Sequence, residues 1–525
     1  MSSSPGGSCS KKNKQVLDGY RKCPNFVSNI FFVMSLNCSM EDLPEALLTE
    51  ILNRITRTGD LNSLSLVSKQ LYKIEGNQRD AIRVGSGLCT ATEALTSFCT
   101  RFPNLRKVEI NYSGWIPGHG NQLDNKGLSV FSSHCSSLID LTLSFCSCID
   151  DSGLACLAYC KTLVSLRLNS APKITSVGLF SVAVGCTNLS ALHLTDCDEI
   201  DNVEWMEYLG RDGSLEELVV KNCKGINHHD FLKFGPGWMK LRKFEFERKR
   251  GRYDLLDPGN VVYDSSYDAH SMDVYDFFCE SLKDLRLAHI ETWPEVGLRV
   301  VLGKRKALEK LCLQYVRALN DNDMIALSRS CSNLKSISLW LNLQRYSSDV
   351  NYCETRTSFT DNSLYALALN CRMLQMIDLS FIGCDADWPS EIGFTQEGFL
   401  VLIQSCPICV LVLNNANFFD DEGMKALSSS PHLETLELIL CHAVTDARMR
   451  FIAHTPCLSN LTLRMCHNIT DVGVAELEDA QKLESLVIES CGEVSLQAAQ
   501  RVAKSVQYSS ECSNALMKKI GLGGY

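Results

Sequence analysis

Closely spaced cysteines and histidines are the residues of this chain whose types could support metal or redox chemistry. Cys406-Pro-Ile-Cys409 has the spacing of a zinc-binding or redox pair, but no second pair follows it at the distance a zinc finger needs. Cys146-Ser-Cys148 and His228-His229 are also isolated in the sequence. The chain contains no glycine-rich phosphate loop and no His-Glu-x-x-His motif. We therefore expect packed cysteines, solvated histidines, no catalytic site, and no bound metal or other cofactor.

The size and composition of the chain indicate an ordered protein that is larger than one compact core. Its 525 residues exceed the roughly 250–300 at which a single core stops growing. An apolar share of 45% and a charged share of 21% are typical of globular proteins. A net charge of −10 argues against nucleic acid as the main partner. Twenty-six cysteines without a clear secretory signal suggest reduced thiols in the cytoplasm or nucleus.

Residues 1–39 have the rough order of a secretory signal, with basic residues before an apolar stretch at 26–36. The stretch begins late, is interrupted by Ser28 and Asn29, and is shorter than the ~20 residues that a membrane span needs. We interpret residues 1–39 as a disordered leader and expect no membrane partner. Met34 and Met40 are alternative starts.

A Leu-x-x-Leu-x-Leu pattern recurs along most of the chain after about residue 100. Leu138, Leu141 and Leu143 form one clear copy. The first residue of each copy falls at positions 105, 138, 163, 189, 215, 241, 282, 308, 334, 374, 408, 433, 458 and 483. Most steps are 25 or 26 residues, and the longer steps indicate insertions. The pattern predicts about fourteen repeats over residues 85–505.

Each repeat is expected to form one short strand followed by one helix. The strand leucines alternate with other residues, so the leucines should point inward and the others outward. Asp or Thr stands at the start of segments that follow a predicted strand, such as the segment 151–160. Its side chain can accept hydrogen bonds from the unpaired N–H groups of a first helical turn. Stacked repeats bury these faces, which predicts an α/β solenoid shaped like a horseshoe, with parallel strands on the concave side and helices on the convex side.

Cysteines recur at two positions of the repeat. Six of them lie three residues after the second strand leucine, namely Cys146, Cys197, Cys223, Cys441, Cys466 and Cys491. Six more lie three residues before the first leucine, namely Cys135, Cys160, Cys186, Cys279, Cys331 and Cys371. The pattern resembles the cysteine-containing class of leucine-rich repeats over roughly residues 99–505. Both positions are therefore expected to be buried turns, and the middle repeats, which lack the first cysteine, to be less regular.

Two amphipathic helices are expected before the repeats, within residues 40–84. The first follows Pro44, and the second follows Gly59 and extends to about Ile74. This short segment holds more apolar residues than it can bury, and exposed apolar residues mark a partner surface. The alternative is a helical cap over the first repeat, because the end repeats of a solenoid need covering.

The same segment resembles an F-box, with L-P-x-x-L-L-x-x-I-L followed by D-L-x-x-x-x-L-V-S-K. Leu71 and Ser68 stand where the family usually has tryptophan and cysteine. The resemblance, which extends to plant-type F-box/leucine-rich-repeat proteins, implies binding to a Skp-family adaptor, and through it to the cullin and RING subunits of an SCF-type ubiquitin ligase. The adaptor contacts that it implies are Leu43, Pro44, Leu47, Leu48, Ile51, Leu52, Leu66, Val67 and Lys69.

A protein substrate is expected to bind the concave face and the insertions, because loops on one rim of a solenoid often carry binding. The largest insertion covers about residues 248–278 and is rich in tyrosine. The predicted substrate contacts are Arg167, His193, Arg286, Trp340, Tyr253, Tyr263 and Tyr267. Plant hormone-receptor relatives hold an inositol polyphosphate with clustered arginines and lysines. No such cluster stands out here, so we expect no such ligand.

Four functional hypotheses follow, of which the last is an enzyme of another class. The first is a non-catalytic substrate-recognition subunit of an SCF ligase that delivers a protein for ubiquitination and degradation. The second is a receptor of the same architecture that needs a small molecule to complete its substrate site. The third is a ligase-independent scaffold. In each case the expected domains are a leader at 1–39, an F-box at 40–84, a repeat solenoid at 85–505 and a tail at 506–525.

Overall fold

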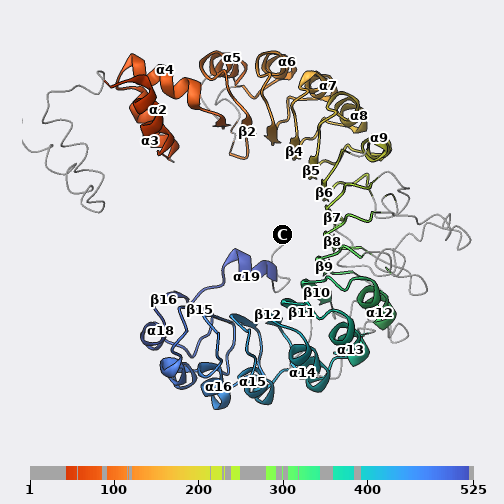
Figure 1. The fold of residues 1–525 in the computed structure, drawn as a ribbon, viewed down its shortest axis with the longest axis vertical. Helices are drawn as coiled ribbons and strands as arrows, with labels where there is room; N and C mark the ends of the chain where they lie inside the picture. The colour runs from red at the N-terminus through yellow and green to blue at the C-terminus, as the bar shows by residue number, and fades with distance from the viewer. Residues whose placement is uncertain are drawn as a thin grey trace, which may run out of the picture.

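The computed structural model shows an open arc of stacked repeats with three short helices at one end (Figure 1). It describes residues 43–55, 57–85, 91–114, 116, 121–212, 214–226, 230, 238–248, 279–290, 298, 306–316, 319–342, 359–382 and 392–519. The predicted leader and the largest insertion, with Tyr253, Tyr263 and Tyr267, lie outside these residues. So do His228, His229 and most of the other insertions. In the part of the chain that is described, no helix has the length and apolar character needed to cross a membrane.

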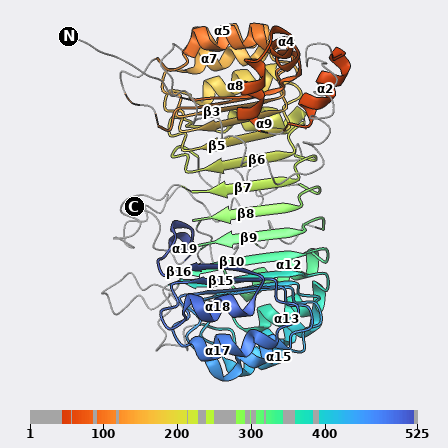
Figure 2. The same ribbon diagram turned by 90° about the vertical axis from the view of Figure 1, so that its left-hand side faces the viewer.

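Sixteen parallel strands form one sheet in which the spatial order follows the order of the chain. The strands are β1 (Ala81–Val84), β2 (Lys107–Asn111), β3 (Asp140–Ser144), β4 (Ser165–Asn169), β5 (Ala191–Thr195), β6 (Glu217–Lys221), β7 (Lys243–Glu247), β8 (Asp284–Ala288), β9 (Lys310–Gln314), β10 (Ser336–Asn342), β11 (Met376–Ile382), β12 (Val410–Asn414), β13 (Thr435–Ile439), β14 (Asn460–Arg464), β15 (Ser485–Glu489) and β16 (Ser505–Ser509). The sheet lines the inside of the arc (Figure 2). The predicted parallel, unclosed horseshoe is confirmed.

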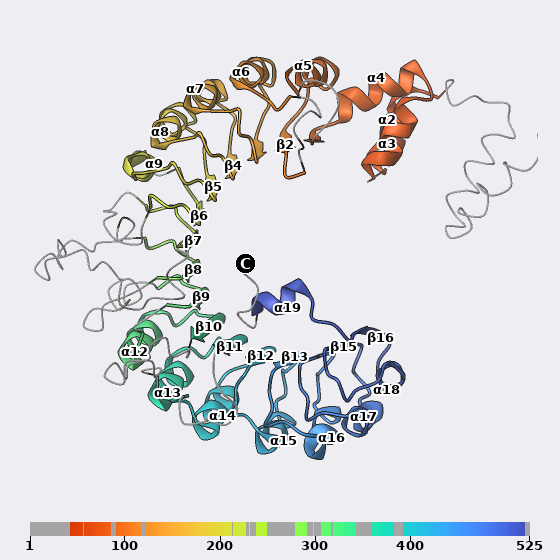
Figure 3. The same cartoon turned by 180° about the vertical axis from the view of Figure 1, so that it is seen from behind.

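Helices cover the outer side of the sheet, as the repeat predicted (Figure 3). They are α5 (Ala91–Arg101), α6 (Asn125–His134), α7 (Asp151–Ala155), α8 (Ser176–Gly185), α9 (Glu204–Asp212), α12 (Asp321–Ser330), α13 (Asp361–Asn370), α14 (Gln396–Ser405), α15 (Asp421–Leu427), α16 (Met449–Ala453), α17 (Asp471–Ala475) and α18 (Leu496–Val502). The N-terminal module contains α2 (Glu45–Asn53), α3 (Thr58–Ser65) and α4 (Lys69–Gln78). The expected single helix from Gly59 to Ile74 is therefore wrong, because Ser68 caps a new helix and divides the segment into α3 and α4. A last helix, α19 (Asn514–Lys519), lies inside the arc.

The strand leucines build the core because the register between neighbouring strands keeps equivalent residues side by side. Leu141 pairs with Leu166, and Leu143 with Leu168, so buried leucines form continuous rows across the sheet. The cysteines at both repeat positions are buried thiols, as predicted. Burial raises the pKa of Cys146 to about 12, which keeps this thiol protonated and chemically inert.

The sheet extends beyond both limits that the repeat pattern suggested. β1 lies in the stretch that the sequence assigned to the F-box, and it pairs with β2 as the first strand of the sheet. β16 pairs with β15 and reaches into the predicted tail. Neither strand has the Leu-x-Leu pattern, because an edge strand needs to bury fewer side chains.

A ladder of aspartates joins the starts of successive helices and explains why a Thr or Asp cap followed by Asp recurs there. Thr470 caps α17, and its backbone N and Oγ donate to Asp446 of the preceding repeat at 2.8 and 2.7 Å. Thr175 bonds to Asp151 in the same way, at 2.7 and 2.6 Å. A Cβ atom at Gly473 would collide with Asp446, so glycine is needed where the helix passes over this carboxylate. The ladder therefore links neighbouring repeats along one rim.

Replacement of Asp446 with alanine is expected to loosen the last repeats. The substitution leaves the Thr470 N–H and hydroxyl without their acceptor, at a cost of about 2 kcal/mol. Because each repeat contacts only its neighbours, hydrogen exchange should quicken in β14 and β15 more than in β3 and β4. Asp479→Ala, which changes an exposed side chain in the next repeat, is the control. Equal exchange in the two variants would contradict the role of the ladder.

Candidate protein-interaction sites

The turn between α3 and α4 holds the most exposed apolar residues of the N-terminal module. Leu66 and Val67 follow the end of α3 and are 84% and 68% exposed. Ser68 caps α4 by accepting a hydrogen bond from the backbone N of Leu71 at 3.2 Å, which holds the turn in place. Two adjacent exposed apolar side chains on a capped, well-defined turn are suited to insertion into a partner.

Helix α2 divides its apolar residues between the module's core and its surface. Leu48 and Leu52 are buried with Leu71 and Ile74 of α4. Leu47, on the neighbouring stripe, is 52% exposed. The sequence-based set of adaptor contacts therefore contains two kinds of residue. Pro44, Leu47, Leu66, Val67 and Lys69 are exposed, and Leu43 and Ile51 are half-buried.

Leu48 and Leu52 were expected to contact the adaptor, but the structure places both in the module's own core. They lie four residues apart on α2, and this spacing turns both side chains toward α4. In this fold their packing against α4 holds α2 in place while Leu47 stays exposed. We define the N-terminal apolar set as Pro44, Leu47, Leu66 and Val67.

The junction between the N-terminal module and the solenoid is built around the buried carboxylate of Glu75, in α4. Glu75 is 2% exposed and forms ion pairs with Arg79 at 2.5 Å and with Arg101 of α5 at 2.9 Å. The Arg101 guanidinium also stacks over Tyr72, 4.1 Å from the ring centroid. A Cβ atom at Gly76 would lie 2.8 Å from the Arg101 carbonyl oxygen, so α4 and α5 meet closely. The module is thus packed tightly onto the first repeat.

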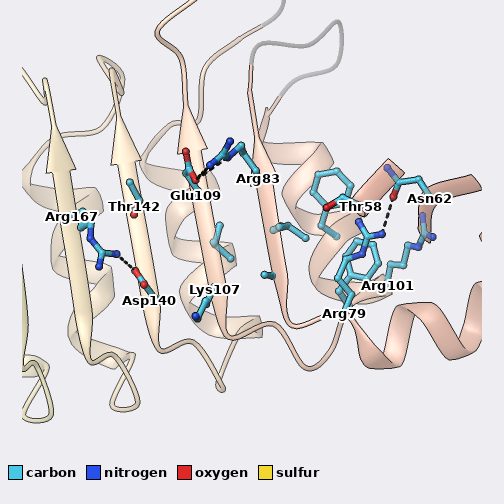
Figure 4. A pocket seen from close by; sticks show the side chains of 15 residues that line it. Thr58, Asn62, Arg79, Arg83, Arg101, Lys107, Glu109, Asp140, Thr142 and Arg167 are labelled. Carbon is cyan, nitrogen blue, oxygen red and sulfur yellow. Dashed lines mark hydrogen bonds and ion pairs between the residues drawn. The ribbon is translucent and has the colours of Figure 1, made fainter. Parts of the chain in front are cut away.

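A polar cleft of about 650 Å³ opens beside this junction (Figure 4). Its lining holds five basic side chains, Arg79, Arg83, Arg101, Lys107 and Arg167, and two carboxylates, Glu109 and Asp140. Arg83 pairs with Glu109 at 2.8 Å, Arg167 pairs with Asp140 at 2.6 Å, and Arg79 donates to Asn62 at 2.8 Å. Any anion entering the cleft would have to compete with these carboxylates. The excess of positive charge in the lining favours an acidic group as the occupant of the cleft.

The predicted concave contacts lie on four different strands and form no single cluster. Arg167 is on β4, in the cleft of Figure 4. His193 lies on β5, and its Nε2 is 3.0 Å from Glu217. Burial lowers the pKa of His193, against the opposing effect of the Glu217 carboxylate. Arg286 on β8 pairs with Asp284 of its own strand at 3.1 Å.

The fourth predicted contact, Trp340 on β10, belongs to an aromatic cluster on the concave side. Its Nε1 donates to Asp378 at 2.9 Å, and Ser338 donates to the same carboxylate oxygen at 2.8 Å. The Tyr315 ring meets Trp340 edge-on at 6.3 Å and stacks on His289 at 4.6 Å. His289 and Tyr315 were not among the residues predicted from the sequence. Both residues directly follow a strand, at the turn of the repeat, and this position could have identified them as candidates.

That position after the strand adopts a left-handed backbone in many repeats. His289 and Tyr315 have φ values of 55° and 54°, and Leu440 and Met465 both have 52°. The backbone N of each residue donates to a carbonyl at or near the end of the next strand, as from His289 to Gln314 at 2.9 Å. These hydrogen bonds compensate for the unfavourable conformation. The repeat thereby places one side chain per turn on the rim where the strands end.

Cys406 and Cys409, the pair with zinc-like or redox-like spacing, lie where one repeat passes from its helix to its strand. Cys406 directly follows α14, as predicted, and its Sγ donates to the Cys371 carbonyl at 3.5 Å. Burial raises the pKa of Cys406 to about 11. Among the described residues, no group of three or more His, Cys, Asp or Glu side chains is placed to hold a metal ion.

Comparisons with known proteins match both parts of the chain. The family model for the F-box domain matches residues 40–80, and a Leucine Rich repeat model matches residues 134–158. GRR1-like protein 1 from Arabidopsis thaliana is 26% identical over 391 residues, which cover 69% of this chain and 62% of the relative. The match therefore spans less than two thirds of that relative's length.

Solved structures with a similar course of the chain include three of different origin. The structure of the yeast Rad7 and Elc1 complex gives a TM-score of 0.42 at 13% identity and covers 95% of this chain and 98% of its own. An internalin from Listeria monocytogenes gives 0.39 at 14% identity, with 81% and 92% covered. The TLR13–ssRNA13 complex gives 0.41 at 16% identity, with 85% and 57% covered.

Proposed function

We propose that this chain, an F-box and leucine-rich-repeat protein, is the substrate-recognition subunit of an SCF-type ubiquitin ligase. The observation that carries the proposal is the N-terminal apolar set, which stays exposed while the module has a complete core of its own. Leu66 and Val67 are more exposed than a simple cap over the first repeat would require. A Skp-family adaptor is the partner that an F-box at residues 40–80 implies.

The adaptor would bring the cullin and RING subunits, while the solenoid would hold a protein substrate. Tight packing at Glu75 and Gly76 keeps the adaptor-binding helices at a constant distance from the concave face. Such a geometry raises the effective concentration of substrate lysines near the ubiquitin-conjugating enzyme. The chain itself would contribute positioning and no bond chemistry.

Substrate would contact the concave face at Arg167, His193, Arg286 and Trp340, and the tyrosines of the 248–278 insertion are further proposed contacts. Ion pairs between neighbouring strands, such as Lys221 to Glu245 at 2.6 Å, hold the charged side chains in place. A partner with alternating charges could exchange these pairs for its own, which favours a protein surface.

Affinity purification from cells tests the whole proposal. The wild-type chain should recover a Skp adaptor and a cullin, and the Leu66→Asp/Val67→Asp variant should recover neither. Substrates should accumulate on that variant, because it still binds them but no longer delivers them for degradation. Recovery of the same ligase subunits with both chains would count against the proposal.

The aromatic cluster at β8–β10 supports the second hypothesis, a receptor that needs a small molecule. His289, Tyr315 and Trp340 present ring surfaces beside the polar groups of Ser338 and Asp378, a combination common in small-molecule sites. A ligand bound there would raise the unfolding temperature of the purified chain. A shift that persists in Trp340→Ala would place the ligand elsewhere.

A further inference from the structure

Helix α19 returns to the inside of the arc and lies against the last repeats (Figures 1 and 3). Its Leu516 is 1% exposed and shares a cluster with Ile439, which is fully buried. Leu440, Met465 and Met517 pack around this pair. A segment that the sequence assigned to a tail therefore covers part of the surface that faces into the horseshoe.

Polar contacts fix where α19 begins. The backbone N of Ser513 donates to the Glu489 carboxylate at 2.6 Å, and the Ser513 hydroxyl accepts from the backbone N of Leu516 at 3.2 Å. Glu489 is held by Arg464, which also pairs with Glu437 at 3.0 Å. Side chains from β13, β14 and β15 thus hold the Glu489 carboxylate in place, and this carboxylate accepts a hydrogen bond from the residue that precedes α19.

The apolar part of this surface comes from the rim position described above. Leu440 and Met465 occupy it directly after β13 and β14, where other repeats carry residues such as Ser170 and Asp196. Neighbouring strands lie about 4.8 Å apart, close to the ~5.4 Å rise of one helical turn. A helix lying across the strand ends can therefore place successive turns against successive repeats. We call Ile439, Leu440 and Met465 the helix shelf.

The contact between α19 and the helix shelf is small. The helix has six residues, and residues 511–514 before and at its start are exposed. Leu516 is its one fully buried side chain among those described. A tether of a few residues from β16 supplies an effective concentration in the millimolar range, which keeps even a weak contact closed. A separate helix with more anchors could replace it.

We propose that the helix shelf is a docking surface for a short amphipathic helix of the substrate protein, and that α19 occupies it in cis until such a helix displaces it. The recognised pattern is the one α19 presents, a capping serine followed three residues later by a leucine anchor. The role of the partner as a substrate rests on the proposed function. The docking surface and its masking by α19 do not.

The test uses the full-length chain and a fluorescent peptide of residues 510–525 carrying Cys512→Ser. The substitution Leu516→Asp within the chain should release α19 and expose the shelf. The peptide should then bind the Leu516→Asp chain with a dissociation constant of about 100 μM, and it should bind the wild-type chain about tenfold more weakly, because the tethered α19 competes there at an effective concentration of about 1 mM. A peptide that itself carries Leu516→Asp should not bind either chain, and Glu511→Gln, at an exposed position, should have no effect.

Met465→Asp, added to the Leu516→Asp chain, should abolish peptide binding without changing the unfolding temperature of the repeats. Failure of the peptide to bind the released chain, or equal affinity for the released and wild-type chains, would overturn the proposal. The assay contains no adaptor. Loss of adaptor binding in other experiments would therefore refute the ligase role while leaving the docking surface intact.

Discussion

The Leu66→Asp/Val67→Asp variant is expected to lose binding to a Skp-family adaptor by at least about 100-fold. Apolar anchors that fill a partner's pocket commonly contribute about 2 kcal/mol or more each, and aspartate would also place a charge in the contact. Both side chains are exposed in the isolated chain, so the variant should fold normally. Isothermal titration with the purified adaptor measures the effect.

Val177→Asp is the matched control for this variant. Val177 lies on the convex helix α8 and is 67% exposed, against 68% for Val67. The control therefore adds one of the two charges, at the same exposure as Val67, without touching the N-terminal module, and it should bind the adaptor like the wild-type chain. Equal loss of affinity in both variants would mean that the turn between α3 and α4 has no special role.

Glu75→Ala is expected to be the most destabilising single change at the junction, at about 3–5 kcal/mol. It leaves Arg79 and Arg101 without their shared carboxylate, and these side chains are only 11% and 26% exposed. We expect α4 and α5 to separate before the rest of the solenoid unfolds. Hydrogen exchange should therefore quicken in α2–α5 and stay unchanged beyond β6.

Glu50→Ala provides the comparison, because Glu50 also pairs with an arginine four residues later, Arg54, at 3.0 Å. Both partners of that pair are exposed, so its loss should cost within about 0.5 kcal/mol. If Glu75→Ala lowered the free energy of unfolding as little as Glu50→Ala does, the ion pairs at the junction would contribute little to the stability of the chain. The geometry between adaptor and substrate would then be less constrained than we infer.

Most of the fold could be predicted because it follows from local periodicity. Alternating leucines such as Leu141 and Leu143 set the strands, and their spacing set the register between repeats. Capping residues such as Thr470 marked where helices begin. The edge strands β1 and β16 could not be predicted this way, because their side chains do not repeat the pattern.

The candidate sites could be predicted only in part, because they depend on contacts between distant residues. The exposure of Leu66 fits the sequence-based expectation, whereas the burial of Leu48 depends on how α2 turns against α4. The link from Glu75 to Arg101 and the contact of Leu516 with Ile439 join segments that no repeat relates. Periodicity carries no information about such pairs.

Mixing the purified wild-type chain with a Skp-family adaptor tests the central claim most directly. We expect a 1:1 complex with a dissociation constant below about 1 μM, in which hydrogen exchange slows within α2, α3 and the turn at Leu66 and Val67. Absence of a complex at tens of micromolar, or protection confined to the solenoid strands, would contradict it.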